Sequence, residues 1–358
     1  MVKSAYIHIP FCNTICSYCD FCKFLKDKTW VKDYLISLES EIKMSYKGEI
    51  LNTLYVGGGT PSCLNKEELT KLFNIISNFK LNKTYEFTFE CNIENITEEL
   101  LIFLKDNRVN RISIGVETFN DKYLKFLNRH HTKDSAIKTI NLVKKYFDNI
   151  NVDLIYAIPE ETLEELESDI DILLSLDIPH ISTYSLIIEE HTKLYIDKTK
   201  NIDDSLDCDM YNLVINKLSS YNHYEISNFA KVGYESKHNL TYWNNNEYYG
   251  FGCGASGYID NIRYDNTRSI TDYIRGIYVL DSHKLDKEEE ISNEFILGLR
   301  KIQGINKNTF KSKYNIDIKS IAIVNKLLSE NKLIEDEDNI YINPKNIYTS
   351  NYILEEFI

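Results

Sequence analysis

Short runs of apolar residues alternate with longer amphipathic stretches along the first half of the chain. Residues 3–10 (KSAYIHIP), 52–59 (NTLYVGGG) and 85–92 (YEFTFECN) are the first three such runs, and they are rich in aromatic and β-branched residues. Runs of this kind are typical of strands in a buried sheet. Between them, as in residues 67–79 (EELTKLFNIISNF), apolar side chains recur every three or four positions, which predicts helices with one buried face.

Three further strand-like runs follow at residues 111–118, 151–159 and 180–189. Six runs therefore alternate with helical stretches between residue 3 and about residue 195. Strands and helices in this order form βαβ units and hence a parallel sheet. We predict an α/β fold, a partial (β/α)6 barrel of the TIM type, with its functional site at the carboxyl ends of the strands.

The pattern changes near residue 285, where amphipathic helical stretches and one short strand-like run, residues 339–344 (NIYINP), take over. We interpret residues 1–230 as the barrel domain, 231–285 as a glycine-rich connecting segment, and 286–358 as a small helical domain with a wing. We expect this last domain to cover the mouth of the barrel. Helix-and-wing units also bind DNA, but the many acidic residues in this segment disfavour that function.

Composition narrows the class of protein. With 358 residues, of which 43% are hydrophobic, the chain can bury a large core. We find no positively charged leader before residue 6 and no run of about 18 apolar residues, so we expect a cytoplasmic protein, and a peripheral position at a membrane stays open. The formal net charge of -13 disfavours nucleic acid as the main partner.

Four of the eight cysteines, Cys12, Cys16, Cys19 and Cys22, lie within eleven positions directly after the first strand-like run. In a reducing cytosol such a group favours metal binding over disulfides. Three thiolates spaced C-x3-C-x2-C can hold three irons of a [4Fe–4S] cluster and leave the fourth iron open. The alternative is a structural zinc site on all four thiols, which usually needs two separated C-x2-C knuckles. The chain offers no convincing second knuckle.

Unusual residues also fall at the ends of the predicted strands, among them the glycines of residues 57–59 and the carboxylate of Glu90. Residues without a Cβ let the backbone approach a small zwitterion closely. A carboxylate at a strand end can accept hydrogen bonds from hydroxyl or ammonium groups. An ordinary tight turn and a solvated carboxylate are the alternatives at these two positions.

Taken together, the cysteine spacing, with Tyr18 directly before the third cysteine, and the GGGTP sequence at residues 57–61 resemble the radical S-adenosylmethionine superfamily. The resemblance implies that the open iron binds the amino and carboxylate groups of S-adenosylmethionine. It also implies that reduction of the cluster cleaves the sulfonium to a 5'-deoxyadenosyl radical.

The resemblance narrows to the oxygen-independent coproporphyrinogen III oxidase-like family and covers nearly the whole chain. It rests on YIHIPFC, NRISIGVETFND, NVDLIYAIPEET, YEISNFAKVGYESKHNLTYW and GFGCGASGY, in addition to the GGGTPS segment. The short lead before Tyr6 and the HNLTYW box at residues 238–243 resemble the heme-chaperone branch of this family. The decarboxylating oxidases typically carry an N-terminal extension and a fourth cysteine one residue after the third, whereas Cys22 follows after two residues.

The resemblance implies roles for individual residues. Cys12, Cys16 and Cys19 match the cluster ligands. Positions that contact S-adenosylmethionine in the oxidases correspond to Tyr6, Gly58, Gly59, Thr60 and Glu90. Positions that hold a second S-adenosylmethionine there correspond to Tyr18, Glu117, Arg129 and Asp153. Glu117 stands where we expect glutamine, and this added negative charge speaks against a second cofactor molecule.

His238 in the HNLTYW box is the predicted heme ligand, because an imidazole can ligate heme iron and the following aromatic residues can pack on a porphyrin. The alternative is a buried histidine whose partners belong to the core. Cys22 has three possible roles, as a spare thiol, as an iron ligand in a damaged cluster, or as an axial heme ligand. The remaining cysteines Cys63, Cys91 and Cys208 are expected to be small buried hydrophobes, and Cys253 is given no role.

Two functions of different class follow from the resemblance. The first is a heme chaperone that binds a [4Fe–4S] cluster, S-adenosylmethionine and heme, and delivers heme to an acceptor protein such as a membrane-bound respiratory enzyme. The second is an oxidoreductase of porphyrin biosynthesis, either a coproporphyrinogen III oxidase or a related enzyme that modifies a tetrapyrrole. Both functions require a reductant for the cluster.

Overall fold

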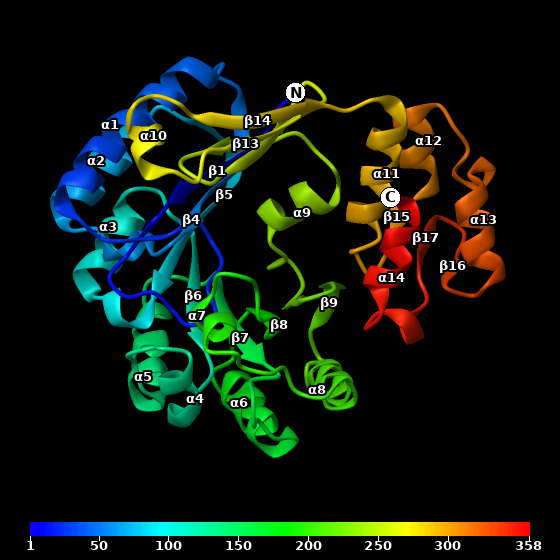
Figure 1. Ribbon diagram of the computed structural model, residues 1–358, viewed down its shortest axis with the longest axis horizontal. Coiled ribbons are helices and arrows are strands. Elements are labelled where there is room, and N and C mark those ends of the chain that lie inside the picture. The colour runs from blue at the N-terminus through cyan, green and yellow to red at the C-terminus, as the bar shows by residue number, and fades with distance from the viewer.

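Six parallel strands form the centre of the main sheet, as the sequence predicts. The computed structural model describes residues 1–358 and shows this sheet curving around an inner space (Figure 1). The strands, in the order in which they pair, are β1 (Ser4–Ile9), β4 (Ile50–Gly58), β5 (Lys80–Asn92), β6 (Arg111–Glu117), β7 (Ile150–Tyr156) and β8 (His180–Ser185). The predicted α/β partial barrel is confirmed.

Three strands that the sequence analysis did not identify extend this sheet at both edges. β11 (Tyr249–Phe251) pairs in parallel with β1, and β10 (Asn228–Ala230) and β9 (Asn222–Glu225) continue the sheet antiparallel beyond β8. The sheet therefore has nine strands, and its two outermost strands, β11 and β9, do not pair with each other. The barrel is open along this side.

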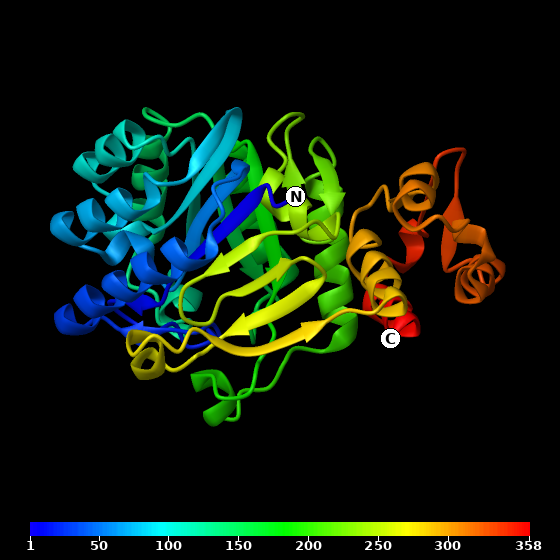
Figure 2. The same ribbon diagram turned by 90° about the horizontal axis from the view of Figure 1, so that it is seen from above.

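Helices cover the outer face of the sheet (Figures 1 and 2). The first turns of α2, α5 and α6 are fixed by capping boxes. In a capping box, the side chain at the helix start and the side chain three residues later each accept a hydrogen bond from the other residue's backbone N–H. The helices are α1 (Lys28–Ser45), α2 (Lys66–Ile76), α3 (Glu98–Asp106), α4 (Asp121–Phe126), α5 (Lys133–Val143), α6 (Leu163–Ser175) and α8 (Asp204–Lys217). The short helix α7 (Lys193–Ile196) lies instead against the loop after β2, where the N–H of Leu194 donates to the carbonyl of Ser17 at 3.1 Å.

The predicted connecting segment, residues 231–285, contributes to the barrel itself. Its helix α9 (Lys237–Trp243) lies between the two edges of the sheet (Figure 1). The carboxylate of Glu86, on β5, accepts hydrogen bonds from the backbone N–H groups of Lys237 and His238, each at 3.0 Å, and so holds the start of α9. The rest of the segment forms β11, an antiparallel sheet of β12 (Ser256–Ile259), β13 (Ile262–Asn266) and β14 (Val279–Lys284), and helix α10 (Ile270–Ile274).

The C-terminal segment is helical with a small wing, as predicted. It contains α11 (Lys287–Gly298), α12 (Lys307–Tyr314), α13 (Ala322–Ser329) and α14 (Ser350–Leu354), and a three-stranded sheet of β15 (Ile305–Asn306), β17 (Asn339–Ile342) and β16 (Leu333–Glu335). The boundaries of the three proposed domains stay a prediction.

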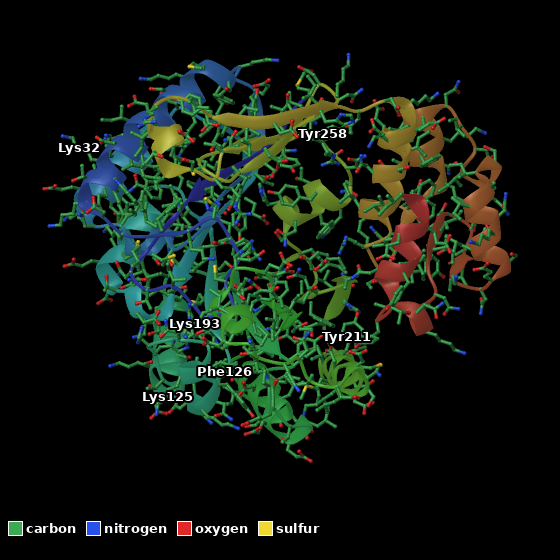
Figure 3. The ribbon with its side chains drawn as sticks, in the orientation of Figure 1. Lys32, Lys125, Phe126, Lys193, Tyr211 and Tyr258 are labelled. Atoms are coloured by element: carbon green, nitrogen blue, oxygen red, sulfur yellow. The ribbon has the colours of Figure 1, made fainter.

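The expectation that this domain covers the mouth of the barrel is wrong. It packs beside the open side of the sheet, where the N–H of Ile226 donates to the carbonyl of Arg300 at 3.1 Å, and the hydroxyl of Tyr348 donates to the carbonyl of Asp204, on α8, at 3.2 Å. Tyr211 of α8, labelled in Figure 3, packs its ring near that of Tyr348. The side of the sheet where β11 and β9 stay unpaired therefore receives this domain, and no residue of it lines the cavity at the mouth.

One apolar core of 75 buried residues is continuous from the barrel into the C-terminal domain. The two parts are therefore held together by buried side chains as well as by surface contacts. Nowhere does the chain form a helix with the length and apolar character needed to cross a membrane.

Candidate cluster and cofactor site

The three predicted cluster cysteines lie in one loop at the mouth of the barrel. The loop begins at β2 (Phe11–Cys12) and ends at β3 (Phe24–Leu25), and these two short strands pair in parallel, so that the loop is closed at its base. Cys12 is buried, whereas Cys16 and Cys19 are half-buried, and all three line the same cavity.

This cavity has a volume of about 450 Å³ and opens at the carboxyl ends of the strands. Its size lies in the range of small-molecule sites. It brings together all of the sequence-predicted site residues except Tyr6 and His238. No residue of the C-terminal domain lines it.

The glycine turn after β4 has no room for side chains. A Cβ on Gly57 would lie 2.6 Å from the carboxylate of Glu90, and a Cβ on Gly58 would lie 2.5 Å from the ring of His8. Gly58 also has a φ of +113°, which residues with a side chain rarely adopt. On Gly59, a Cβ would lie 2.9 Å from the carbonyl oxygen of Phe11. The turn therefore brings backbone against the cluster loop.

Glu90 is held at the end of β5 by two donors. The hydroxyl of Tyr55 donates to its Oε1 at 2.7 Å, and the backbone N–H of Gly58 donates to its Oε2 at 2.9 Å. Burial raises the pKa of Glu90 to about 7, although both hydrogen bonds oppose this rise. Each carboxylate oxygen keeps a lone pair for a further donor, so Glu90 can also bind a ligand ammonium or hydroxyl group.

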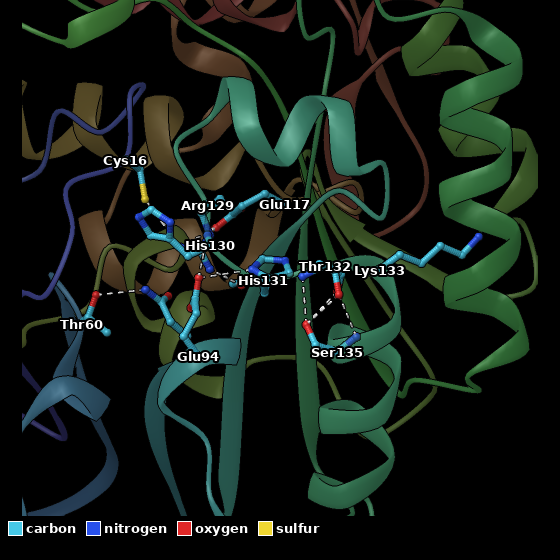
Figure 4. A network of polar contacts seen from close by, with 12 residues as sticks. Cys16, Thr60, Glu94, Glu117, Arg129, His130, His131, Thr132, Lys133 and Ser135 are labelled. Atoms are coloured by element: carbon cyan, nitrogen blue, oxygen red, sulfur yellow. Dashed lines mark hydrogen bonds and ion pairs between the residues drawn. The ribbon is translucent and has the colours of Figure 1, made fainter.

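Thr60 and Arg129 contact two of the cluster cysteines. The hydroxyl of Thr60 donates to the sulfur of Cys12 at 3.4 Å, and the Nη1 group of Arg129 donates to the sulfur of Cys16 at 3.5 Å. Figure 4 shows Arg129 between Cys16 and Glu117. The Nη2 group of Arg129 donates to the carbonyl of a neighbouring strand at 2.5 Å, whereas its Nε has no partner. A buried positive charge therefore lies beside the cluster loop.

Glu117 reaches the cavity through an irregularity at the end of β6. The pairing register with β7 shifts between Gly115 and Glu117, and Glu117 has a φ of +71°. Its Oε1 lies 3.9 Å from Nη1 of Arg129. Burial raises the pKa of Glu117 to about 7, and the charge of Arg129 opposes that rise. Burial, together with the charge of Glu117, raises the pKa of Tyr18 well above its usual value.

Asp153 lies on β7 and lines the cavity. The amide of Asn151 donates to its Oδ1 at 2.9 Å, and the hydroxyl of Ser113 donates to its Oδ2 at 3.4 Å. Burial raises the pKa of Asp153, although these hydrogen bonds oppose it. The carboxylate therefore has a fixed orientation on the cavity wall.

Arg111 is a cavity residue that the sequence analysis missed. It is 2% exposed, lines the cavity, and makes no side-chain hydrogen bond or ion pair with the rest of the chain. The sequence could have indicated that Arg111 faces the cavity. Arg111 begins the strand-like run RISIGVET, and the alternation of side chains along a strand places it on the same face as Ser113. Burial raises the pKa of Asp153 and of Glu90, whereas the charge of Arg111 lowers it, so these two carboxylates offset part of the cost of burying Arg111, and its unused donors can bind an anionic ligand.

Neither Tyr6 nor His8, a second residue that the sequence analysis missed, lines the cavity, but the ring of His8 lies against Gly58 of the glycine turn. The hydroxyl of Tyr6 lies 2.9 Å from Nδ1 of His8, and Nε2 of His8 lies 2.7 Å from the carbonyl oxygen of Cys22. Burial lowers the pKa of His8 to about 4, so the ring is neutral near pH 7. The contact between Tyr6 and S-adenosylmethionine stays a prediction.

His238 is buried, at 1% exposure, and both of its ring nitrogens already have partners. Nδ1 lies 2.8 Å from the hydroxyl of Thr53, and Nε2 lies 2.7 Å from the hydroxyl of Tyr242. Iron could reach a ring nitrogen only if α9 moved and one of these bonds broke. The predicted contact with heme stays a prediction, and this conformation matches the alternative of a satisfied core histidine.

Comparisons with known proteins agree with this arrangement. The model of the Radical SAM superfamily matches residues 6–173. The chain is 39% identical to the "Heme chaperone HemW" of Lactococcus lactis, over 99% of this chain and 97% of that protein. It is 38% identical to the "Heme chaperone HemW" of Bacillus subtilis, over 100% of this chain and 99% of that one.

A solved structure, the coproporphyrinogen III oxidase HemN of Escherichia coli, has the same fold. It superposes with a TM-score of 0.87 over 99% of this chain and 90% of that one, at 21% sequence identity. A radical SAM domain implies a [4Fe–4S] cluster and S-adenosylmethionine as cofactors. From its sequence relatives, its domain and its fold, this chain belongs to the HemW family of the radical SAM superfamily.

Proposed function

We propose that the chain is a heme chaperone: it holds a [4Fe–4S] cluster on Cys12, Cys16 and Cys19, binds S-adenosylmethionine and heme, and passes heme to acceptor proteins. The observation that carries the proposal is the shared cavity. The three thiols, the glycine turn and Glu90 open into the same space. The heme part rests on the relatives, which are named heme chaperones and match this chain along nearly their whole length.

The arrangement of the thiols favours an iron–sulfur cluster over zinc. Three thiolates of one loop can hold three irons of a [4Fe–4S] cluster and leave the fourth iron open. A structural zinc site usually needs four protein ligands. The fourth cysteine of the loop, Cys22, does not line the cavity, which leaves three thiols for the cluster.

S-adenosylmethionine fits the cavity next to the glycine turn. Gly58 and Gly59 line the cavity, where their backbone groups can contact the methionine part, and Glu90 offers free lone pairs to ammonium or ribose hydroxyl groups. When bound and reduced, the pair of cofactors can supply a 5'-deoxyadenosyl radical. Because Glu117 already faces the guanidinium of Arg129, we propose that one molecule of S-adenosylmethionine binds.

Heme binding involves the HNLTYW helix, α9, in this proposal. His238 becomes an iron ligand after α9 shifts and one of its two hydrogen bonds is released. The energetic cost of that shift lowers the apparent affinity for heme, which suits a protein that must give heme away. The proposed partners are a heme-acceptor protein, for example a membrane-bound respiratory enzyme, and a reductant for the cluster, with the chain itself in the cytoplasm.

The proposal is tested on protein reconstituted without oxygen. We expect about four iron and four sulfide per chain, a reduced-cluster spectrum that shifts on addition of S-adenosylmethionine, and stable heme binding. Cys16→Ser should lose the cluster, whereas Cys63→Ser, which changes a buried thiol outside the predicted ligand set, should keep it.

Two outcomes would overturn the proposal. If the reconstituted chain contains zinc in place of iron, the proposed [4Fe–4S] cluster and its role in binding S-adenosylmethionine are wrong. Release of 5'-deoxyadenosine and CO2 from coproporphyrinogen III, without heme binding, supports the oxidase alternative instead.

A further inference from the structure

Two cysteines outside the predicted ligand set lie against each other close to the cluster loop. The sulfurs of Cys22 and Cys253 are 3.7 Å apart although the residues are 231 positions apart in the chain. They are 6% and 0% exposed, and both are free thiols. Their proximity arises only from the fold, because Cys22 ends the cluster loop and Cys253 follows β11.

The turn that carries Cys253 is shaped for this approach. Gly254 has a φ of +81°, and a Cβ on it would lie 2.3 Å from Cβ and 2.9 Å from the sulfur of Cys22. Any other residue at position 254 would therefore push the two segments apart. On the other side, Nε2 of His8 lies 2.7 Å from the carbonyl oxygen of Cys22 and helps to fix the loop. The two sulfurs are held in contact from both sides.

The two thiols differ chemically. The sulfur of Cys253 lies 3.1 Å from the carbonyl oxygen of Thr267, so its proton has an acceptor there as well as on Cys22. The hydrogen bond from Cys253 lowers the pKa of Cys22, with burial opposing it, and the same contact, together with burial, raises the pKa of Cys253. A pair with one sulfur that ionises more easily is typical of thiols that exchange with disulfides.

Cys22 is buried in an irregular part of the chain. Its preceding neighbour, Phe21, is 62% exposed, and both residues form a bend and not a helix or strand, so a local movement of this bend is needed to expose the thiol. A disulfide requires the sulfurs to approach to about 2.05 Å. The sulfurs are 3.7 Å apart, so closure requires them to approach by roughly 1.6 Å.

We propose that Cys22 and Cys253 are a dithiol–disulfide pair that a small disulfide such as oxidised glutathione can close. The sulfur of Cys22, as thiolate, attacks one sulfur of the oxidant and releases one molecule of thiol. The sulfur of Cys253 then loses its proton and attacks Cys22 in the mixed disulfide, which releases the second thiol. The chain gives up two electrons and two protons, and the oxidant takes them up. Cys12, Cys16 and Cys19 are not consumed.

The disulfide would tie the end of the cluster loop to the turn after β11. Because His8 contacts both Cys22 and the glycine turn at Gly58, this link would also restrain the wall of the cavity. We expect slower amide hydrogen exchange in residues 19–26 of the oxidised chain. The inference does not depend on heme binding or heme transfer, and it would stand if the chaperone proposal failed.

The test is a titration with glutathione redox buffers, done on the full chain after anaerobic reconstitution. Free thiols are alkylated, and the digested chain is analysed by mass spectrometry for a peptide that links Cys22 to Cys253. We expect this linked peptide in the oxidised wild type, with the loss of two free thiols outside the cluster. Neither Cys22→Ser nor Cys253→Ser should give this linked peptide. Cys63→Ser removes a buried thiol that has no thiol partner, so this variant should give the linked peptide as the wild type does.

Three results would overturn the inference. The first is the absence of the linked peptide at every buffer ratio in the folded wild type, which needs no variant. The second is a linkage of Cys22 to a cluster cysteine in its place. The third is a change of the cluster spectrum in Cys22→Ser, because it would make Cys22 an iron ligand.

Discussion

The Nη1 group of Arg129 donates a hydrogen bond to the sulfur of Cys16 at 3.5 Å. Arg129 follows the end of α4, so this contact joins that part of the chain to the cluster loop, 113 positions earlier in the sequence. It places a cation, 6% exposed, beside a predicted cluster ligand. A buried cation in this position favours anionic groups next to it, both the cluster thiolate and the carboxylate of a ligand.

Replacing Arg129 should therefore weaken the binding of the cluster. We expect Arg129→Gln to lose the reconstituted cluster to a chelator roughly tenfold more readily, because a hydrogen bond to a charged group contributes about 1.5–3 kcal/mol. The iron and sulfide that remain after exposure to the chelator measure this change. Arg275→Gln, at an exposed arginine, is the control and should keep the cluster normally. Equal losses in the two variants would exclude the role of Arg129.

Glu90 should make stability depend on pH. Burial raises its pKa to about 7 from the ordinary 4.5, so between these pH values the folded chain holds a proton that the unfolded chain has lost. Stability therefore falls as pH rises from about 4.5 to about 7 and then changes no further through this group. Glu90→Gln should flatten this part of the profile in urea unfolding of the cofactor-free chain. Glu67→Gln, at an exposed glutamate, should leave the profile unchanged, and an identical slope in both variants would contradict the prediction.

Gly58 should tolerate no side chain, because a Cβ there would clash with His8. A double variant that also shortens His8 can test this cause. Gly58→Ala combines a strained φ with a Cβ 2.5 Å from His8, whereas Gly233→Ala has a comparable φ of +88° and nothing within 4 Å. We expect Gly233→Ala to cost about 1 kcal/mol and Gly58→Ala clearly more. Adding His8→Ala to Gly58→Ala should restore part of the loss in urea unfolding. No restoration would show that the clash with His8 is not the cause.

Thr53 should control how readily His238 reaches heme. Thr53→Val keeps the shape of the side chain but removes the partner of Nδ1, so it lowers the cost of releasing His238. We expect this variant to bind heme more tightly than the wild type, and His238→Ala to bind it more weakly, in titrations followed by absorbance. If all three chains bind heme equally, His238 is not the ligand.

Replacing Arg111 should affect the stability of the chain and the binding of S-adenosylmethionine differently. Its buried guanidinium has no hydrogen-bond partner in the protein, and Glu90 and Asp153, whose pKa it lowers, can take up a proton when it is lost, so Arg111→Met should leave the cofactor-free chain about as stable as the wild type. The same change should weaken S-adenosylmethionine binding, because the cavity loses its unpaired cation. Unfolding in urea and equilibrium binding test the two halves separately. A destabilised variant with normal binding would show that Arg111 is a structural residue.

The sequence by itself determined the six parallel strands and the cysteine loop. Both depend on local features: the alternation of apolar runs with amphipathic stretches, and a ligand spacing within eleven positions. Because parallel strands end at one edge of a sheet, residues as distant in sequence as Cys12, Glu90 and Asp153 could be expected near one another, and they line one cavity.

Only the tertiary structure decided the contacts between segments without a shared periodic pattern. It brought Cys253 against Cys22, left Arg111 without a partner, and gave both ring nitrogens of His238 to Thr53 and Tyr242. It also placed the C-terminal domain at the open side of the barrel and not over its mouth. Local propensity cannot encode these features, because each depends on which surfaces remain unpaired after the sheet has formed.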